Sequence, residues 1–128
     1  MKTFPLTCVV LLFLLVSCKK SDFIASSTLT GKWQLVTSYY STGGPLIYKD
    51  VDNDTKIYIN FGKNGELDYS NSGYTRYMIK DSITITFLKN DQTTFDYYYK
   101  IYDGKLNLSP RTNMCIEGCG SIFRKVEE

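Results

Sequence analysis

The feature that most constrains this chain is a series of short alternating runs that begins at Gly31. Ser82 to Leu88 is an example, because Ile83, Ile85 and Phe87 alternate there with polar residues. A period of two is typical of strands that bury one face. The pattern predicts strands over Lys32–Tyr40, Lys56–Phe61, Glu66–Ser70, Tyr74–Lys80, Ser82–Leu88, Thr93–Tyr102, Lys105–Leu108 and Ser121–Val126.

Turn signals separate these runs at roughly ten-residue spacing. Asn64-Gly65 and Asp103-Gly104 are typical hairpin dipeptides, and no stretch shows a helical period. Short turns make consecutive strands antiparallel neighbours, and such a meander forms either a barrel or a sandwich. Barrel closure is favoured because it removes exposed strand edges. The predicted fold class is all-β, an antiparallel up-and-down β-barrel of about eight strands.

The composition supports strands and excludes several kinds of site. The 128 residues suffice for one domain, and they include 11 tyrosines but only one alanine, Ala25. The absence of histidine excludes Ser-His-Asp triads and His-ligated zinc or haem. A net charge of +2 gives no basic footprint for nucleic acid. We expect no nucleic-acid partner, metal site or cofactor, and no enzyme activity, because no nucleophile or base stands in a recognisable spacing.

The first 17 residues have the layout of a signal peptide. Lys2 is a short positive region, and the apolar run from Leu6 to Val16 is too short to span a bilayer as a helix. The run ends in Leu15-Val16-Ser17-Cys18, which resembles a bacterial lipobox. The resemblance implies that residues 1–17 are removed and that Cys18 receives acyl chains such as palmitate, which anchor the protein to a membrane. The alternative is ordinary secretory cleavage beside an incidental cysteine.

Two further cysteines of the mature chain lie close together near the C-terminus. Cys115 and Cys119 are separated by three residues, of which Gly118 allows a tight turn. Outside the cytoplasm, two such thiols normally oxidise to a disulfide. A metal site is the alternative, although two thiolates without histidine are too few ligands.

The start of the predicted barrel carries a family resemblance. Residues 18–30 form a polar tether after the lipidated cysteine, and residues 31–128 form the domain. Gly31 and Trp33 stand as in the G-x-W motif of lipocalins, and Arg124 lies on the last predicted strand. The whole layout is similar to small lipocalin-like (calycin-like) lipoproteins of Gram-negative bacteria. The resemblance implies that Arg124 packs over Trp33 where the first and last strands close the barrel.

An acidic cluster and an aromatic run are the remaining candidates for a site. Asp50 to Asp54 looks like the start of an EF-hand loop but has Thr55 and Phe61 where that motif needs Gly and Glu, so a solvated turn is favoured over calcium. The aromatic run is Tyr97-Tyr98-Tyr99, in which the alternation places Tyr97 and Tyr99 inward and Tyr98 outside. The alternative is an aromatic platform for a sugar or a flat apolar ligand. As ligand-binding residues among the inward-facing side chains we expect Ile57, Ile59, Phe61, Tyr97 and Tyr99.

Two functions follow from these expectations. The first is a lipoprotein of the bacterial cell envelope, lipid-anchored to the outer membrane, whose lipocalin-like barrel binds a small hydrophobic or amphipathic ligand. The second is an envelope interaction protein, an inhibitor or accessory subunit, whose barrel is filled and whose loops contact a protein partner. The two differ in whether inward side chains leave a cavity of several hundred Å³.

Overall fold

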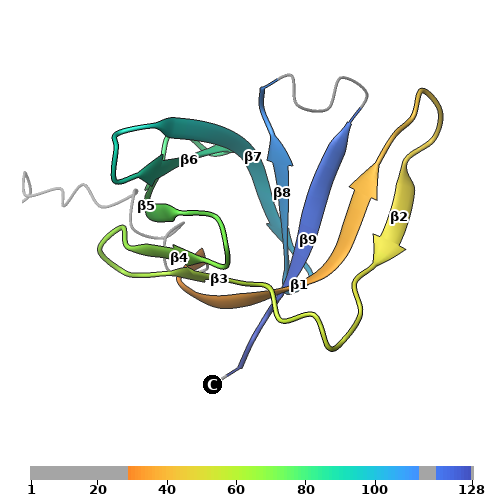
Figure 1. Ribbon diagram of the computed structural model, residues 1–128, viewed down its shortest axis with the longest axis horizontal. Helices are drawn as coiled ribbons and strands as arrows, with labels where there is room; N and C mark the ends of the chain where they lie inside the picture. The colour runs from red at the N-terminus through yellow and green to blue at the C-terminus, as the bar shows by residue number, and fades with distance from the viewer. Residues whose placement is uncertain (1–28, 113–117, 128) are drawn as a thin grey trace, which may run out of the picture.

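The fold is described from a computed structural model that places residues 29–112 and 118–127. Nine strands make up this part of the chain (Figure 1). They are β1 (Gly31–Tyr40), β2 (Ile47–Asp50), β3 (Tyr58–Phe61), β4 (Leu67–Tyr69), β5 (Tyr74–Ile79), β6 (Thr84–Lys89), β7 (Thr94–Tyr102), β8 (Lys105–Pro110) and β9 (Cys119–Lys125). The predicted all-β fold class is therefore confirmed.

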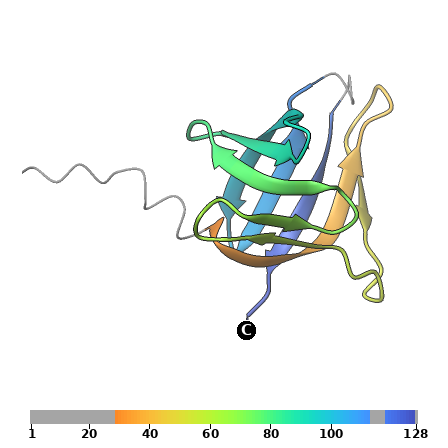
Figure 2. The ribbon, with the colours of Figure 1, turned by 60° about the vertical axis from the view of Figure 1, so that its left-hand side comes forward.

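Eight of the strands form one antiparallel sheet that curls into a nearly closed barrel. The order is β4-β3-β1-β9-β8-β7-β6-β5, so the strands from β5 to β9 lie beside their neighbours in the chain, β3 pairs with β4 and β1, and the first strand pairs with the last. Strand β2 pairs with β1 beside this path. Figure 2 shows β3, β4 and β5 crossing in front of β7, β8 and β9. This up-and-down topology is the one that the sequence predicts, and it is compatible with a lipocalin-like fold.

The barrel closes between β4 and β5 through a few specific bonds. Glu66 and Arg76 form an isolated antiparallel bridge, and the Tyr77 amide donates to the Gly65 carbonyl at 3.0 Å. The Tyr77 hydroxyl also donates to the Gly62 carbonyl at 2.6 Å. The two ends of the sheet are thus joined by isolated hydrogen bonds rather than by a continuous ladder of strand pairing.

Strand β1 has two successive partners along the same edge. Its first half pairs with β3, from Gly31 opposite Phe61, and its second half pairs with β2, from Thr37 opposite Asp50. Between the halves, the register with β9 shifts at Leu35 and Thr37, which marks a β-bulge at Val36. The sequence analysis missed β2, because its four residues are all exposed and carry no buried alternation.

Both predicted hairpin dipeptides form tight turns. Asp103 and Gly104 both have positive φ, at 48° and 69°, which is the backbone of a type I′ turn. Gly65 has φ 87° and follows Asn64 in the turn between β3 and β4. The hairpin predictions are confirmed.

The interior of the barrel holds a continuous apolar core. Its buried members come from all parts of the sheet and include Leu29, Trp33, Leu35, Ile59, Phe61, Leu67, Tyr77, Ile85, Phe87, Leu106, Leu108 and Phe123. The predicted inward side chains of β1, β3, β6 and β7 are buried or partly buried, although Thr84 and Thr86 of β6 are buried as well, and the prediction fails at Ile83. That side chain is 57% exposed because it precedes β6, in the turn where its amide is held by Asp81 at 2.9 Å.

Candidate functional site

The predicted pairing of the first and last strands is present beside Trp33, but the cation over the indole is a different residue. Trp33 is 1% exposed and donates its indole N–H to the Leu29 carbonyl at 2.8 Å. Lys125, its partner in the β1–β9 register, places Nζ 5.2 Å from the centre of the indole ring. Arg124 pairs with Gln34 instead and is exposed on the outer wall. The prediction of Arg124 over Trp33 was wrong by one residue, and a one-residue step in a strand reverses the face.

Gly31 belongs to the same closure for a steric reason. Its φ of 120° is one that side chains rarely adopt, and a Cβ there would lie 3.3 Å from Cε of Lys125. The glycine therefore leaves room for the lysine stem to cross toward the indole. The glycine of the G-x-W pattern thus allows the Lys125 ammonium to lie over the Trp33 ring.

Aromatic rings fill the interior around Phe87. The ring centre of Phe87 lies 4.8 Å from that of Tyr97, 5.5 Å from Tyr74 and 6.1 Å from Phe61. Tyr69 lies at 6.2 Å from the same ring. Such spacings are those of rings in direct contact.

The predicted ligand-binding residues lie in or against this packed core. Ile59 and Phe61 are both 0% exposed, so a ligand could reach them only by displacing their neighbours. Ile57, Tyr97 and Tyr99 are partly buried and pack against the core. The structure therefore brings the five residues to one interior, and their role in ligand binding stays a prediction.

The interior tyrosines keep neutral hydroxyls. Burial raises the pKa of Tyr97 well above its usual value, and the neighbouring phenol of Tyr74 raises it further. Burial is also the main cause that raises the pKa of Tyr69 and of Tyr99. The described interior thus offers apolar rings and neutral hydroxyls, and burial moves the pKa values of Tyr69, Tyr97 and Tyr99 away from neutral pH.

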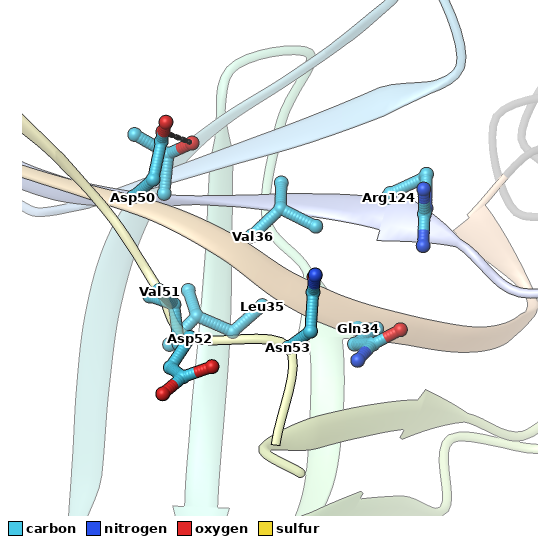
Figure 3. Close-up of a pocket in the computed structure, with 9 residues that line it drawn as sticks. Gln34, Leu35, Val36, Asp50, Val51, Asp52, Asn53 and Arg124 are labelled. Atoms are coloured by element: carbon cyan, nitrogen blue, oxygen red, sulfur yellow. Dashed lines mark hydrogen bonds between the residues drawn. The ribbon is translucent and has the colours of Figure 1, made fainter. Parts of the chain in front are cut away.

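A cleft with different chemistry opens in the outer wall of the barrel, where β1 changes partner from β3 to β2 (Figure 3). We call it the lateral cleft. Its volume is about 550 Å³, which is within the usual range for small-molecule sites. It is lined by Gln34, Leu35, Val36, Thr37, Asp50, Val51, Asp52, Asn53 and Arg124.

The lateral cleft is lined mainly by polar groups, with a small apolar area at its centre. Figure 3 shows Asp50 and Asp52 on one side with their carboxylates pointing apart, Arg124 and Gln34 on the other side, and Val36 and Asn53 between them. The bulge places Val36 here, and the Val51 amide fixes the far wall by donating to the Val36 carbonyl at 2.9 Å. Local strand pairing therefore creates the cleft.

Backbone and side-chain bonds hold the acidic end of the lateral cleft. The Thr37 hydroxyl donates to Oδ1 of Asp50 at 3.1 Å, and the Asp54 amide donates to Oδ1 of Asp52 at 3.4 Å. Each carboxylate keeps acceptor capacity beyond these bonds. The acidic cluster thus forms a turn, as the sequence favours, but the turn is also one end of a cleft.

A second cleft adjoins the first along the bottom of β9. It has a volume of about 670 Å³, and its lining shares Gln34 and Arg124 with the lateral cleft. The other lining residues are Asp103, Gly104, Lys125, Val126 and Glu127. Arg124 therefore lines both clefts.

The cysteine predictions are only partly covered by the structure. Cys18 and Cys115 lie outside the described residues, whereas Cys119 begins β9. Lipidation at Cys18 and the Cys115–Cys119 disulfide therefore stay predictions. Within residues 29–112 and 118–127, no helix has the length and apolar character needed to cross a bilayer, and no three acidic or cysteine side chains gather as metal ligands.

Comparisons with known proteins do not add a family. No protein-family model matches the chain, and a search of curated proteins returns no match.

The lateral cleft was missed by sequence reasoning, because its residues come from β1, from the segment after β2 and from β9. The one local signal was the Asp50–Asp54 cluster, whose carboxylates take part in the lining.

Proposed function

We propose that this protein is a lipid-anchored binding module of the bacterial cell envelope that holds a small amphipathic molecule in the lateral cleft. The observation that carries the proposal is the cleft itself, an opening of about 550 Å³ whose mainly polar lining includes a small apolar area from Leu35, Val36 and Val51. An amphipathic molecule suits such a lining, because its apolar part covers Val36 and Val51 while its polar groups meet charged side chains.

The proposed ligand site lies in the wall of the barrel rather than in its interior. The interior is occupied by rings in contact, with Phe61, Phe87 and Phe123 each 0% exposed. Small barrels of about eight strands are commonly filled by side chains alone. The lateral cleft needs no such displacement, since Val36 and Val51 are only partly buried.

Mass spectrometry of bound molecules tests the ligand proposal. The mature protein is purified from its native envelope as wild type, as Val36→Arg, which fills the cleft, and as Ile83→Arg, a control at a side chain that is 57% exposed outside it. A copurified small molecule that is retained by wild type and Ile83→Arg but lost by Val36→Arg supports the proposal. Equal retention by all three proteins would contradict it.

The anchor is tested separately. Cys18→Ser should move the protein out of the membrane fraction and remove the mass of the acyl chains, because all acylation is placed on that thiol. Unchanged membrane partition with an unchanged mass would contradict the lipoprotein proposal and leave the binding proposal intact.

A second candidate function is an envelope interaction protein that acts through the β1–β2 hairpin. This hairpin carries four of the exposed large apolar side chains, at 43–60% exposure. They are Tyr40, Leu46, Ile47 and Tyr48. Exposed apolar side chains gathered on one element favour a protein contact. A photo-crosslinker at Tyr48 should then capture a defined partner in the native envelope, and one at Met78, which is 55% exposed on β5, should not.

A further inference from the structure

We infer that the outer edge of β2 binds an extended segment of a partner protein as an added antiparallel strand, and that Lys49 and Asp50 select a segment with matching charges. This inference rests on the second candidate function, in which the β1–β2 hairpin contacts a protein, and it names the kind of partner. It follows from the unpaired main chain of β2, from its exposed apolar side chains and from its two charges.

Strand β2 is the outermost strand of the sheet. It pairs with β1 along one edge, and no described strand lies along its other edge (Figure 1, Figure 2). The strands at the two ends of the main path, β4 and β5, differ from it because they share the bonds that close the barrel. All four residues of β2 are exposed. Such an edge presents amides and carbonyls to which another strand can add.

The register with β1 shows which main-chain groups of β2 point outward. The Val51 amide donates to the Val36 carbonyl at 2.9 Å, so these two residues form a hydrogen-bonded pair. Hydrogen-bonded and non-hydrogen-bonded pairs alternate along an antiparallel ladder. Lys49 therefore directs its amide and carbonyl toward β1, whereas Tyr48 and Asp50 direct theirs away from it. Among residues 29–112 and 118–127, no turn or loop hydrogen bond engages these outward groups.

The side chains of β2 offer contacts on both of its faces. Ile47 is 44% exposed and Tyr48 is 60% exposed, and successive side chains of a strand point to opposite faces. Lys49 and Asp50 follow them and form no ion pair in the described part of the chain. Thr37 donates to one oxygen of Asp50, which leaves further acceptor capacity on that carboxylate. Each face thus presents one apolar side chain and one charge.

These four side chains specify the partner through cross-strand pairs. Opposite charges directly across a ladder stabilise it and like charges destabilise it, so a carboxylate belongs opposite Lys49 and a cation opposite Asp50. A β-branched residue suits the position opposite Ile47, and an aromatic one suits Tyr48. From its own N-terminus, the added strand therefore has the order cation, carboxylate, aromatic, β-branched. The charges of β2 also disfavour apolar strands that do not match them.

A second copy of this chain does not match the edge in the same way. In an antiparallel ladder, a residue whose main-chain groups point to the added strand lies opposite another such residue. Asp50 is one of these residues and Lys49 is not. Two copies of β2 therefore cannot place Lys49 opposite Asp50 in any antiparallel register, and we assign the edge to a segment of a different protein.

Two capped heptapeptides of equal composition test the inference. The matched peptide is Thr-Lys-Glu-Phe-Val-Leu-Thr, which brings its lysine opposite Asp50 and its glutamate opposite Lys49. The swapped peptide is Thr-Glu-Lys-Phe-Val-Leu-Thr, which brings like charges to both places. Fluorescence anisotropy of the labelled peptides measures their binding to the mature protein, purified as above. We expect the matched peptide to bind about fivefold more tightly than the swapped one.

A charge exchange on the protein should reverse this preference. The double variant Lys49→Asp, Asp50→Lys keeps the net charge and should bind the swapped peptide about fivefold more tightly than the matched one. The control is Lys63→Asp, Asp68→Lys, an exchange of two exposed charges outside β2, which should keep the wild-type preference. Thermal unfolding of each variant checks that the protein stays folded.

Hydrogen exchange of single amides, followed by NMR, distinguishes an added strand from a contact of side chains alone. With the matched peptide bound, the amides of Tyr48 and Asp50 should exchange more slowly, because peptide carbonyls then accept from them. The Lys49 amide already faces β1 and should change least.

The outcomes separate this inference from the function on which it rests. If the two peptides bind equally, or if the Tyr48 and Asp50 amides gain no protection, the added strand is overturned, whereas the crosslinker at Tyr48 still tests the hairpin contact by itself. If those amides become protected without peptide as the protein concentration rises, a second copy occupies the edge and the inference is overturned. Peptide preference with amide protection supports the inference even where the crosslinker captures no partner.

Discussion

The interior of the barrel and its lateral cleft lie on opposite faces of the same strand. On β1, Trp33 points inward and is 1% exposed, whereas Gln34 faces the cleft. The inner face is covered by rings in contact, and the outer face is open where β2 and β3 separate. The difference between the two faces shows that side chains fill the interior of this barrel and stabilise it, whereas its wall leaves side chains accessible at the lateral cleft.

The largest expected effect comes from the centre of the interior. Phe87→Ala should lower the free energy of unfolding by about 3–5 kcal/mol, because it removes a fully buried ring that contacts four others. Urea denaturation measures this loss. Met78→Ala is the control, since Met78 is 55% exposed and should change stability by less than about 0.5 kcal/mol. Equal losses for the two would mean that the interior is not the stabilising region.

The barrel closure gives a smaller and more specific effect. A double-mutant cycle with Trp33→Phe and Lys125→Met should give a coupling of about 1 kcal/mol, because the half-buried ammonium lies over the indole. The same cycle with Arg124→Met should give less than about 0.5 kcal/mol, since Arg124 faces outward. A larger coupling energy for Arg124 than for Lys125 would support the predicted contact between Arg124 and Trp33 and contradict the contact between Lys125 and Trp33.

The acid dependence of stability should come from the outer wall. The hydroxyl of Thr86, at 2.6 Å, and then Lys80, at 3.0 Å, lower the pKa of Asp96 below its ordinary value of 3.8. Because the pKa is lower in the folded state, Asp96 stabilises the fold above about pH 4, and this contribution is lost as pH falls through the folded-state pKa. Asp96→Asn should therefore flatten the fall of the urea midpoint between pH 5 and about pH 2.

The control for the acid experiment is another carboxylate on the surface. The control variant is Asp68→Asn, because Asp68 is exposed on β4 and lies outside the Thr86–Asp96–Lys80 cluster. It should keep the wild-type slope. If both variants have the wild-type slope, the Asp96 cluster does not link stability to pH.

The smallest effect on stability is expected in the lateral cleft. Arg124→Gln should change the free energy of unfolding by less than about 0.5 kcal/mol, because the exposed guanidinium makes no ion pair among the described residues. Differential scanning fluorimetry of wild type and variant measures the change. A loss above about 1 kcal/mol would place Arg124 with the structural residues and contradict the separation between wall and interior.

The sequence by itself predicted eight of the nine strands that the structure describes, their order and most of the core. The alternation of Ile85 and Phe87 with threonines fixes a strand locally, and Asp103-Gly104 fixes a turn, because each depends on neighbouring residues alone. The pairing of the first strand with the last was expected because barrel closure removes exposed strand edges. The strands and the turn need no contact between distant residues to be anticipated.

Only the tertiary structure decided which cation meets Trp33 and where the lateral cleft lies. Arg124 and Lys125 are adjacent, and the register that selects between them is set by the bulge at Val36, which no local pattern marks. The cleft depends on the same bulge and on the change of partner from β3 to β2. Such features arise because strand pairing joins residues about 90 positions apart, and a shift of one residue in that pairing exchanges the inner face for the outer.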